Sequence, residues 1–183
     1  MSKGDTTKAR IIDAAEEVVL RDGVGRLTLE ATAVEAGLSK GGVLYHFASR
    51  DALVAGMVER IIEEFDHDLD EKLGDSTQPG AFTDAYIRST LEPGRGHPGR
   101  EERLGAALIA AAAAQPELMK PLQRAFAGWQ ARLEDDGIDP VLATVLRLAA
   151  DGLWLSELFG LAAPTPAQRA VLGAELEQMV TGP

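Results

Sequence analysis

The chain is predicted to be all-α, with about nine helices, on three observations. Apolar residues recur at helical spacing in most segments, as in Ile11, Ala15 and Val18. No stretch of useful length shows the strict alternation of apolar and polar residues that indicates a half-buried strand. Gly and Pro turns, or residues that favour helix N-caps, separate the segments. We expect an N-terminal domain over residues 1–50 and a helical domain over 51–183.

Three short helices are expected in the N-terminal domain. The first has the apolar face described above, and Asp22-Gly23 ends it. Thr28 and Ser39 precede the second and third helices, where a hydroxyl can accept a hydrogen bond from a free backbone N–H of the first turn. The expected ranges are 7–21, 29–35 and 40–47.

Six further helices are expected in the second domain. Ser49 caps the first of them, and Pro follows a capping residue at the start of the last two, at Asp139-Pro140 and Thr165-Pro166. Loops are expected at 74–80 and 92–99, which are rich in Gly and Pro. The helices are expected over 49–73, 81–91, 100–114, 116 to about 136, 140–160 and 165 to about 180.

Composition narrows the class of protein. The 183 residues include no Cys, which excludes disulfides and thiolate metal sites and fits a reducing compartment. The apolar runs are about half of the ~18 residues that a membrane span requires, and the N-terminus shows no signal-peptide core. We therefore expect a cytoplasmic protein. The sequence shows no catalytic, metal-binding or cofactor-binding motif, so we expect no cofactor and no enzymatic activity.

The charge is unevenly distributed along the chain. Of 18 basic and 29 acidic residues, seven of each lie in residues 1–50, which leaves 11 basic and 22 acidic residues for 51–183. The net charge of −11 therefore belongs to the second domain. A neutral N-terminal domain permits local contact with phosphate, although the acidic domain opposes DNA at long range.

Residues 28–47 have the pattern of a helix-turn-helix. Gly37 can take the left-handed conformation of a tight turn, and Ala33 is small enough to let the two helices approach. Leu38 and Val43 can fill the angle between them. In this motif the second helix places its N-terminal residues in the major groove of DNA.

The side chains of the second helix suit nucleic acid. Ser39 offers a hydroxyl beside free N–H groups, and Lys40 supplies a cation. Gly41 and Gly42 each lower helix propensity by about 1 kcal/mol relative to Ala, which close approach of DNA would explain. Tyr45 and His46 offer further hydrogen-bond donors, and Phe47 is expected to pack in the core of the N-terminal domain. The candidate DNA-binding residues are Thr28, Ser39, Lys40, Gly41, Gly42, Tyr45, His46 and Arg50.

These residues resemble the DNA-binding domain of TetR-family repressors. The resemblance covers about 50 residues and runs from the first helix through Gly37-Leu38-Ser39-Lys40-Gly41 and Leu44-Tyr45-His46-Phe47 to Ser49-Arg50-Asp51. The number and lengths of the remaining helices also fit the family. A shorter stretch, Leu148–Leu153, resembles the CgmR-like, multidrug-responsive repressors. The chain departs from the family at Leu44, where an aromatic residue is common, and at Thr32, where Ile or another large aliphatic is common.

The resemblance implies a homodimeric repressor that occupies a palindromic operator and leaves it when a small hydrophobic, optionally cationic, molecule binds. Two alternatives stay open. One is a DNA-binding regulator without an effector, and the other is an all-α small-molecule-binding protein or enzyme in which the helix-turn-helix is incidental. The operator, the effector and the choice between repression and activation are not encoded in any recognisable motif.

The last two helices are expected to form the dimer interface. Between Val141 and Leu161 only Arg147, Asp151 and Glu157 are charged, so this helix is apolar on most faces and needs cover on more than one side. Two helices from each subunit, about 140–160 and 165–180, would form a four-helix bundle.

Aromatic residues of the second domain are candidates for an effector pocket. Pockets are mostly apolar with a few polar groups, and aromatic rings beside a carboxylate suit a flat or quaternary cation. Asp151 lies in an otherwise apolar helix, where its carboxylate needs a partner, either Arg147 or a cationic ligand. The candidate ligand-binding residues are Phe65, Tyr86, Phe126, Trp129, Asp151 and Trp154.

Overall fold

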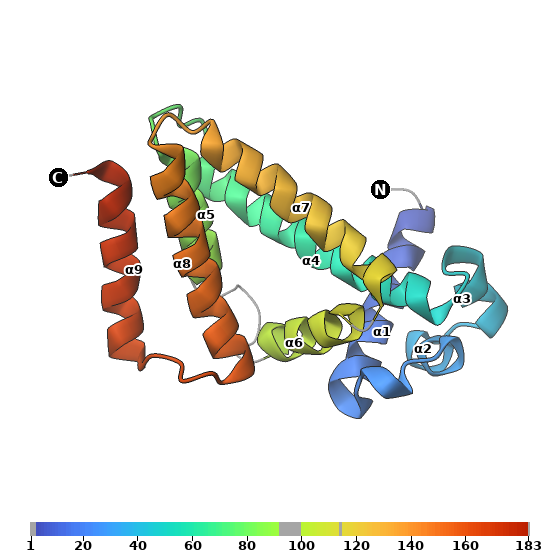
Figure 1. The fold of residues 1–183 in the computed structure, drawn as a ribbon. Coiled ribbons are helices and arrows are strands. Elements are labelled where there is room, and N and C mark those ends of the chain that lie inside the picture. The colour runs from blue at the N-terminus through green and yellow to red at the C-terminus, as the bar shows by residue number, and fades with distance from the viewer. Residues whose placement is uncertain (1–2, 92–99, 114, 183) are drawn as a thin grey trace. The chain divides into compact units, whose positions relative to one another are not determined.

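The computed structural model of the chain describes residues 3–91, 100–113 and 115–182. Nine α-helices and one 3-10 turn lie within these ranges, which confirms the all-α prediction (Figure 1). The elements are α1 (Lys3–Asp22), η1 (Val24–Arg26), α2 (Leu29–Ala36), α3 (Lys40–His46), α4 (Arg50–Leu73), α5 (Ala81–Leu91), α6 (Arg100–Ala113), α7 (Pro116–Glu134), α8 (Pro140–Phe159) and α9 (Pro166–Thr181).

Most of the predicted helix boundaries agree with these to within two residues. The first helix begins earlier than predicted, at Lys3, and Asp5 in its first turn favours the helix dipole. The short η1 turn was not predicted, because three residues are too few to show a periodic pattern of apolar side chains. The predicted loop at 92–99 lies outside the described residues. None of the described helices is both long and apolar enough to cross a membrane.

The chain divides into two compact units. The first consists of the described residues of 1–61 and 99–122, and the second of those of 62–98 and 123–183. Both α4 and α7 therefore contribute to each unit. The predicted domain boundary at residue 50 is the first residue of α4 and stays a prediction.

The first unit packs around the apolar face of α1. Ile11, Ala15 and Val18 are fully buried, and α1 packs against α2, η1 and α6. Gly56 of α4 allows a close approach, because a Cβ there would lie 2.8 Å from the ring of Phe47 and 2.9 Å from Ile12 Cδ1. Phe47 is buried, which confirms its predicted packing role.

Salt bridges and hydrogen bonds join α1 to α4 in the same unit. Arg60 Nε donates to Glu16 Oε1 at 3.0 Å, and its guanidinium also contacts Asp13. Glu16 is buried, so its charge requires such a partner. These contacts hold the middle of α4 against α1, the helix that carries the core of the unit.

The second unit is built around α5. This helix packs against α8 and α9, and one buried cluster joins Ile87 and Leu91 of α5 to Leu146 and Ala150 of α8 and Val180 of α9. A second buried cluster joins α5 to α4, α7 and α8; it contains Leu69, Phe82, Ala85, Tyr86, Trp129, Leu133 and Ala143.

Gly80 determines how α5 begins. Its φ of +82° lies in the left-handed region, and a Cβ would stand 2.5 Å from Val180 Cγ1. Its N–H also donates to the Asp136 carbonyl at 2.7 Å. The end of α9 can therefore pack directly against the start of α5 only because residue 80 has no side chain.

Candidate functional site

Two short helices of the first unit form the predicted helix-turn-helix. Thr28 Oγ1 accepts the Ala31 N–H at 3.0 Å and so caps α2. Gly37 ends α2 with φ 63° and ψ 36°, in the left-handed region. Leu38 N–H then donates back to the Ala33 carbonyl at 2.9 Å, which turns the chain into α3. The turn predicted at Gly37 is confirmed.

Ser39 caps α3 through its side-chain oxygen. Ser39 Oγ accepts the Gly42 N–H at 3.1 Å, a role that leaves the hydroxyl hydrogen available to donate. Thr28 and Ser39 thus combine a capping role with an exposed hydroxyl at the start of their helices. Both are positioned for the phosphate or base-edge contact that the sequence predicts, which stays a prediction.

The surroundings of the two glycines in the first turn of α3 are open. A Cβ at Gly41 would meet only Ser39 Oγ, at 3.9 Å, and a Cβ at Gly42 would meet the same atom at 3.4 Å. The surrounding protein therefore does not require glycine at either position. The two glycines lower the helix propensity of α3 without improving its packing.

Tyr45 is the most exposed large side chain of α3. It is 86% exposed, and its ring meets the partly buried His46 ring edge to face at a centroid distance of 5.1 Å. Leu44 beside it is also exposed. Val43 and Phe47 are buried in the core instead, so α3 presents one face to the unit and the other to solvent.

Lys40 forms an ion pair with Glu30 in the first turn of α2. The lysine side chain is 54% exposed and the glutamate side chain 60%. The hydrogen bond from Lys40 holds the pKa of Glu30 below its ordinary value. Lys40, a predicted DNA-binding residue, is therefore already paired with a carboxylate of the same chain.

Arg50 connects the start of α4 to η1. Its guanidinium donates to the Val24 carbonyl at 3.0 Å and lies 3.4 Å from Asp51. These contacts give Arg50 a positioning role within the unit. About a third of its side chain stays exposed, so contact with a phosphate remains geometrically open.

Four of the predicted ligand-binding residues form one aromatic cluster in the second unit. The Phe65 ring lies 5.5 Å from Tyr86 and 4.8 Å from Trp129, and Phe126 lies 5.0 Å from Trp129. These are the distances of packed aromatic pairs. Trp154 is partly buried on α8, and within the described residues it makes no ring contact with this cluster.

The Asp151 carboxylate accepts hydrogen bonds from two side chains. Tyr86 Oη donates to Oδ1 at 2.8 Å, and Arg147 Nη1 donates to Oδ2 at 2.7 Å. Of the two partners that the sequence left open, the structure shows Arg147. Burial raises the pKa of Asp151, and the bonds from Tyr86 and Arg147 oppose that rise only in part. Burial and the charge of Asp151 also raise the pKa of Tyr86, which keeps its hydroxyl a donor.

Hydrogen bonds extend from this carboxylate along α8 and to Gln130 of α7. Arg147 Nε donates to Gln130 Oε1 at 2.6 Å, and Gln130 Nε2 donates to Thr144 Oγ1 at 2.7 Å. Within the aromatic cluster, Trp129 Nε1 donates to Asp66 Oδ1 of α4 at 2.7 Å. Asp151, Arg147, Gln130 and Thr144 are therefore linked in one series of hydrogen bonds, and the Asp66–Trp129 bond is separate from it.

Two family models match the chain. The family described as bacterial regulatory proteins, tetR family, matches residues 11–57, and the family described as tetracyclin repressor-like, C-terminal domain, matches residues 80–181, more than half of the chain. The chain belongs to the TetR family.

Individual relatives resemble this TetR-family chain to different extents. The HTH-type transcriptional regulator TtgR of Pseudomonas putida is 38% identical over 61 residues, 33% of this chain and 29% of the relative. The chain thus matches less than a third of the length of this curated relative.

Solved structures match over nearly the whole chain. A transcriptional regulator from Rhodococcus sp. Rha1 superposes with a TM-score of 0.73 at 22% identity, covering 95% of this chain and 94% of its own. The multidrug binding protein EbrR, complexed with ethidium, superposes with a TM-score of 0.71 at 27% identity, covering 95% and 98%. The match at 22% identity shows the shared fold alone.

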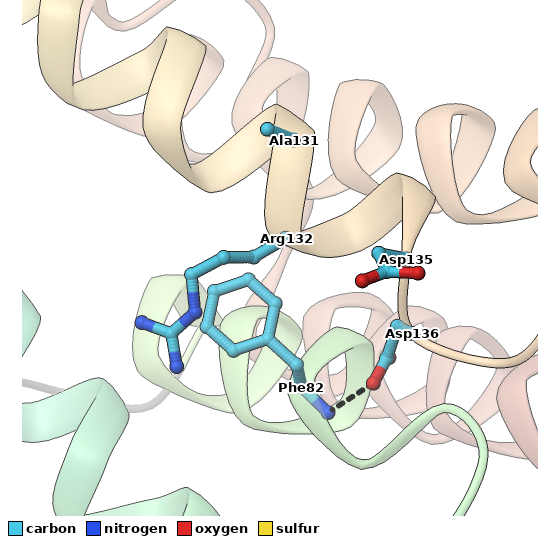
Figure 2. Close-up of a pocket in the computed structure, with 5 residues that line it drawn as sticks. All are labelled: Phe82, Ala131, Arg132, Asp135 and Asp136. Atoms are coloured by element: carbon cyan, nitrogen blue, oxygen red, sulfur yellow. Dashed lines mark hydrogen bonds between the residues drawn. The ribbon is translucent and has the colours of Figure 1, made fainter.

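A shallow pocket in this TetR-family protein is lined by other residues than the predicted ligand residues. It has a volume of about 380 Å³. Figure 2 shows the Arg132 side chain over the Phe82 ring, and the guanidinium carbon lies 3.9 Å from the ring centroid. The lining residues are Phe82, Ala131, Arg132, Asp135 and Asp136. None of the six predicted ligand-binding residues is among them.

Several residues that bond to the candidate side chains, or to the start of α5, could not be found from the sequence. Glu30 pairs with Lys40, Asp66 with Trp129, and Asp136 accepts bonds from the start of α5. Their partners lie ten or more positions away, so no local spacing connects them. No group of three or more His, Asp or Glu residues in the described ranges could hold a metal ion.

Several large apolar side chains on α8 and α9 are exposed. Val141 is 70% exposed and Leu148 is 56% exposed. On α8 they recur at intervals of three, four or seven residues, which places them along one face of the helix. Arg169 Nε donates to Glu157 Oε1 at 2.6 Å and links the two helices. The exposed set on these helices and the loop between them is Val141, Val145, Leu148, Leu155, Phe159, Leu161, Val171, Leu172 and Met179.

Proposed function

We propose that this chain is a repressor that binds a palindromic operator as a homodimer and is released from it by a small hydrophobic ligand. Membership of the TetR family, together with the capped and exposed α3 helix, carries the proposal. The three parts of the proposal, DNA contact, dimerisation and ligand release, rest on different residues and can be tested separately.

The DNA contacts are assigned to the exposed face of the helix-turn-helix. The hydroxyls of Thr28 and Ser39, the Lys40 ammonium and the Tyr45 hydroxyl face solvent at or near the start of α2 and along α3. Backbone and side-chain donors at a helix N-terminus suit phosphate oxygens. Gly41 and Gly42 let the DNA backbone come close, and His46 and Arg50 can add contacts at the edge of this surface.

The homodimer is assigned to the exposed apolar face of α8 and α9. An apolar face of this extent is typical of an interaction surface in a water-exposed protein, and two helices from each subunit would complete a four-helix bundle. A two-fold arrangement would present two α3 helices to a palindromic operator. Its half-sites lie about 34–36 Å apart when they occupy successive major grooves.

The ligand site is assigned to the aromatic cluster and Asp151. Phe65, Tyr86, Phe126 and Trp129 supply stacking surfaces, and the carboxylate supplies negative charge where Arg147 now binds. EbrR, at 27% identity, binds ethidium, which is a precedent for a flat, cationic ligand. Trp154, one turn after Asp151 on α8, would extend the site.

Repression then depends on coupling between the two sites. A ligand that binds more tightly to a dimer whose DNA-binding domains are misplaced for the operator lowers DNA affinity, and DNA lowers ligand affinity by the same factor. Because α4 belongs to both units, it is the element that can transmit a change from one to the other.

The test is binding to a fluorescent duplex that contains the intergenic DNA beside this protein's gene. We expect sequence-selective binding that weakens steeply with salt and is abolished by planar cationic dyes such as ethidium. Lys40→Ala is expected to weaken binding and to lower the salt slope by at most about 1 per subunit. Tyr45→Phe is expected to weaken binding while the dimer stays intact.

A matched control for Lys40 is available in α7. Lys120 is equally exposed, at 54%, and pairs with Glu117 just as Lys40 pairs with Glu30. Lys120→Ala should leave DNA affinity unchanged. If both Lys40→Ala and Tyr45→Phe bind as tightly as the parent, the assignment of α3 is wrong. Selective binding that no ligand relieves would favour a regulator without an effector.

A further inference from the structure

The Lys40–Glu30 ion pair lies on the surface that is assigned to DNA. Lys40 is the first residue of α3 and Glu30 is the second of α2, so the pair bridges the two helices of the helix-turn-helix. Both side chains are more than half exposed. Two oppositely charged groups so exposed contribute little to the stability of a fold, so the pair can be altered without unfolding the domain.

The pair affects what Lys40 can offer to a phosphate. An ammonium that forms an ion pair with a carboxylate must leave it, or must bring the carboxylate close to the phosphate oxygens, before it can bind DNA. The first route breaks an existing contact, and the second places two negative groups near one another. Either route weakens the net contribution of Lys40. The lowered pKa of Glu30 shows that the carboxylate stays charged across the neutral range.

We propose that Glu30 is a positioning residue for DNA binding, which competes with phosphate for the Lys40 ammonium and so lowers the affinity of the protein for the DNA backbone. The inference rests on the proposed function, since it requires that Lys40 contacts DNA. Phosphate contacts carry no sequence information. Glu30 therefore reduces binding to all sequences alike and limits retention on random DNA, where phosphate contacts supply nearly all of the affinity.

The first test replaces Glu30 with its neutral isostere. We expect Glu30→Gln to tighten binding to both operator and random duplex by about threefold to tenfold per dimer, in line with the range measured for exposed ion pairs. The dependence of affinity on salt should become steeper, because Lys40 then releases counterions from DNA without leaving a carboxylate that retains a cation. A purely structural role for Glu30 would not change this slope.

Glu35 provides a control on the same helix. It carries the same charge but pairs with Arg21 of α1, at 2.7 Å, rather than with a residue of α3. Glu35→Gln changes the net charge of the protein equally. The excess tightening of Glu30→Gln over Glu35→Gln therefore measures the local effect at Lys40.

A double-mutant cycle connects the effect to Lys40. In a Lys40→Gln background, Glu30→Gln should change affinity by less than about twofold, because the contested cation is absent. Circular dichroism and thermal unfolding establish that each variant is folded. If Glu30→Gln equals Glu35→Gln, or if its effect persists without Lys40, the inference is overturned.

The outcomes separate this inference from the proposed function. If the parent protein binds no duplex in a salt-dependent manner, even after selection from a random library, both are overturned. If the parent binds and Lys40→Gln weakens binding while Glu30→Gln equals its control, only the role of Glu30 fails.

Discussion

The Asp136 carboxylate accepts both the backbone N–H and the hydroxyl of Thr83, each at 2.7 Å from Oδ2. Its other oxygen accepts the Phe82 N–H at 3.0 Å (Figure 2). Asp136 lies after α7, 53 positions later in the chain than Thr83. A residue distant in sequence thus serves as the N-terminal cap of α5, the helix at the centre of the second unit.

Removing this cap should destabilise the second unit. We expect Asp136→Ala to lower the free energy of unfolding by about 1–3 kcal/mol, because it leaves buried N–H groups of α5 without acceptors. Urea denaturation monitored by circular dichroism measures the change. Asp135→Ala, at the exposed neighbouring position in the same pocket, should cost less than about 0.5 kcal/mol. Equal losses would contradict the capping role.

Two buried threonines should respond oppositely to the same substitution. Thr32 of α2 is fully buried and its hydroxyl has no hydrogen-bond partner within the described residues, whereas the equally buried Thr83 donates to Asp136. Thr32→Val should raise the free energy of unfolding by about 1 kcal/mol, because it removes an unsatisfied polar group at nearly constant shape. Thr83→Val should lower it by about 1–2 kcal/mol. Thermal or urea unfolding would reveal the difference, and a loss at Thr32 would disprove the expectation.

Asp151 should make stability depend on pH in a defined direction. Its pKa is raised in the folded protein, mainly by burial. The folded state therefore retains this proton at pH values where the unfolded chain has released it. The contribution of Asp151 to stability should increase as pH falls from the raised pKa toward the ordinary value near 4.

The measurement compares the parent with Asp151→Asn over a series of pH values. The unfolding free energy of the parent minus that of the variant should grow as pH falls through this window. A difference that stays constant would show that Arg147 and Tyr86 balance burial in setting the pKa of Asp151, and one that grows as pH rises would show that they outweigh it.

The exposed face of α8 supplies a test of the dimer. Leu148→Glu places a charge on the apolar face that we assign to the subunit interface, where an unpaired charge would be buried. Analytical ultracentrifugation should show a dimer for the parent and a monomer for the variant at micromolar concentration. Gln123→Glu adds the same charge at an exposed position of α7 and should remain dimeric. A dimeric Leu148→Glu would place the interface elsewhere.

Local chemistry predicted most of the secondary structure. Caps at Thr28, Ser39 and Thr165 and the left-handed turn at Gly37 act within three or four residues, so each has a signal in the order of residue types. The same holds for the Asp151–Arg147 pair, one turn apart on α8. These features could be predicted because both partners of each contact lie within one helical turn or one tight turn of each other.

Contacts between distant segments could not be predicted. The Asp136 cap of α5 and the Trp129–Asp66 hydrogen bond join residues more than 50 positions apart. The residue types of the aromatic set suited a pocket wall. Four of these rings pack against one another, and this contact depends on how the helices are placed. The order of residues around Lys40 carried no indication that Glu30 would pair with it.

The two glycines at the start of α3 also weaken the first turn of this helix. Val43, at its midpoint, is its buried residue, and Phe47, the residue that ends it, is buried too, so the neighbouring helices hold α3 mainly from Val43 onward. We expect backbone amides of the first turn to exchange hydrogen with solvent faster than those of α1 or α4. Contact with a duplex should slow hydrogen exchange in this turn more than elsewhere. The entropy lost when the turn becomes ordered then lowers the net free energy of DNA binding.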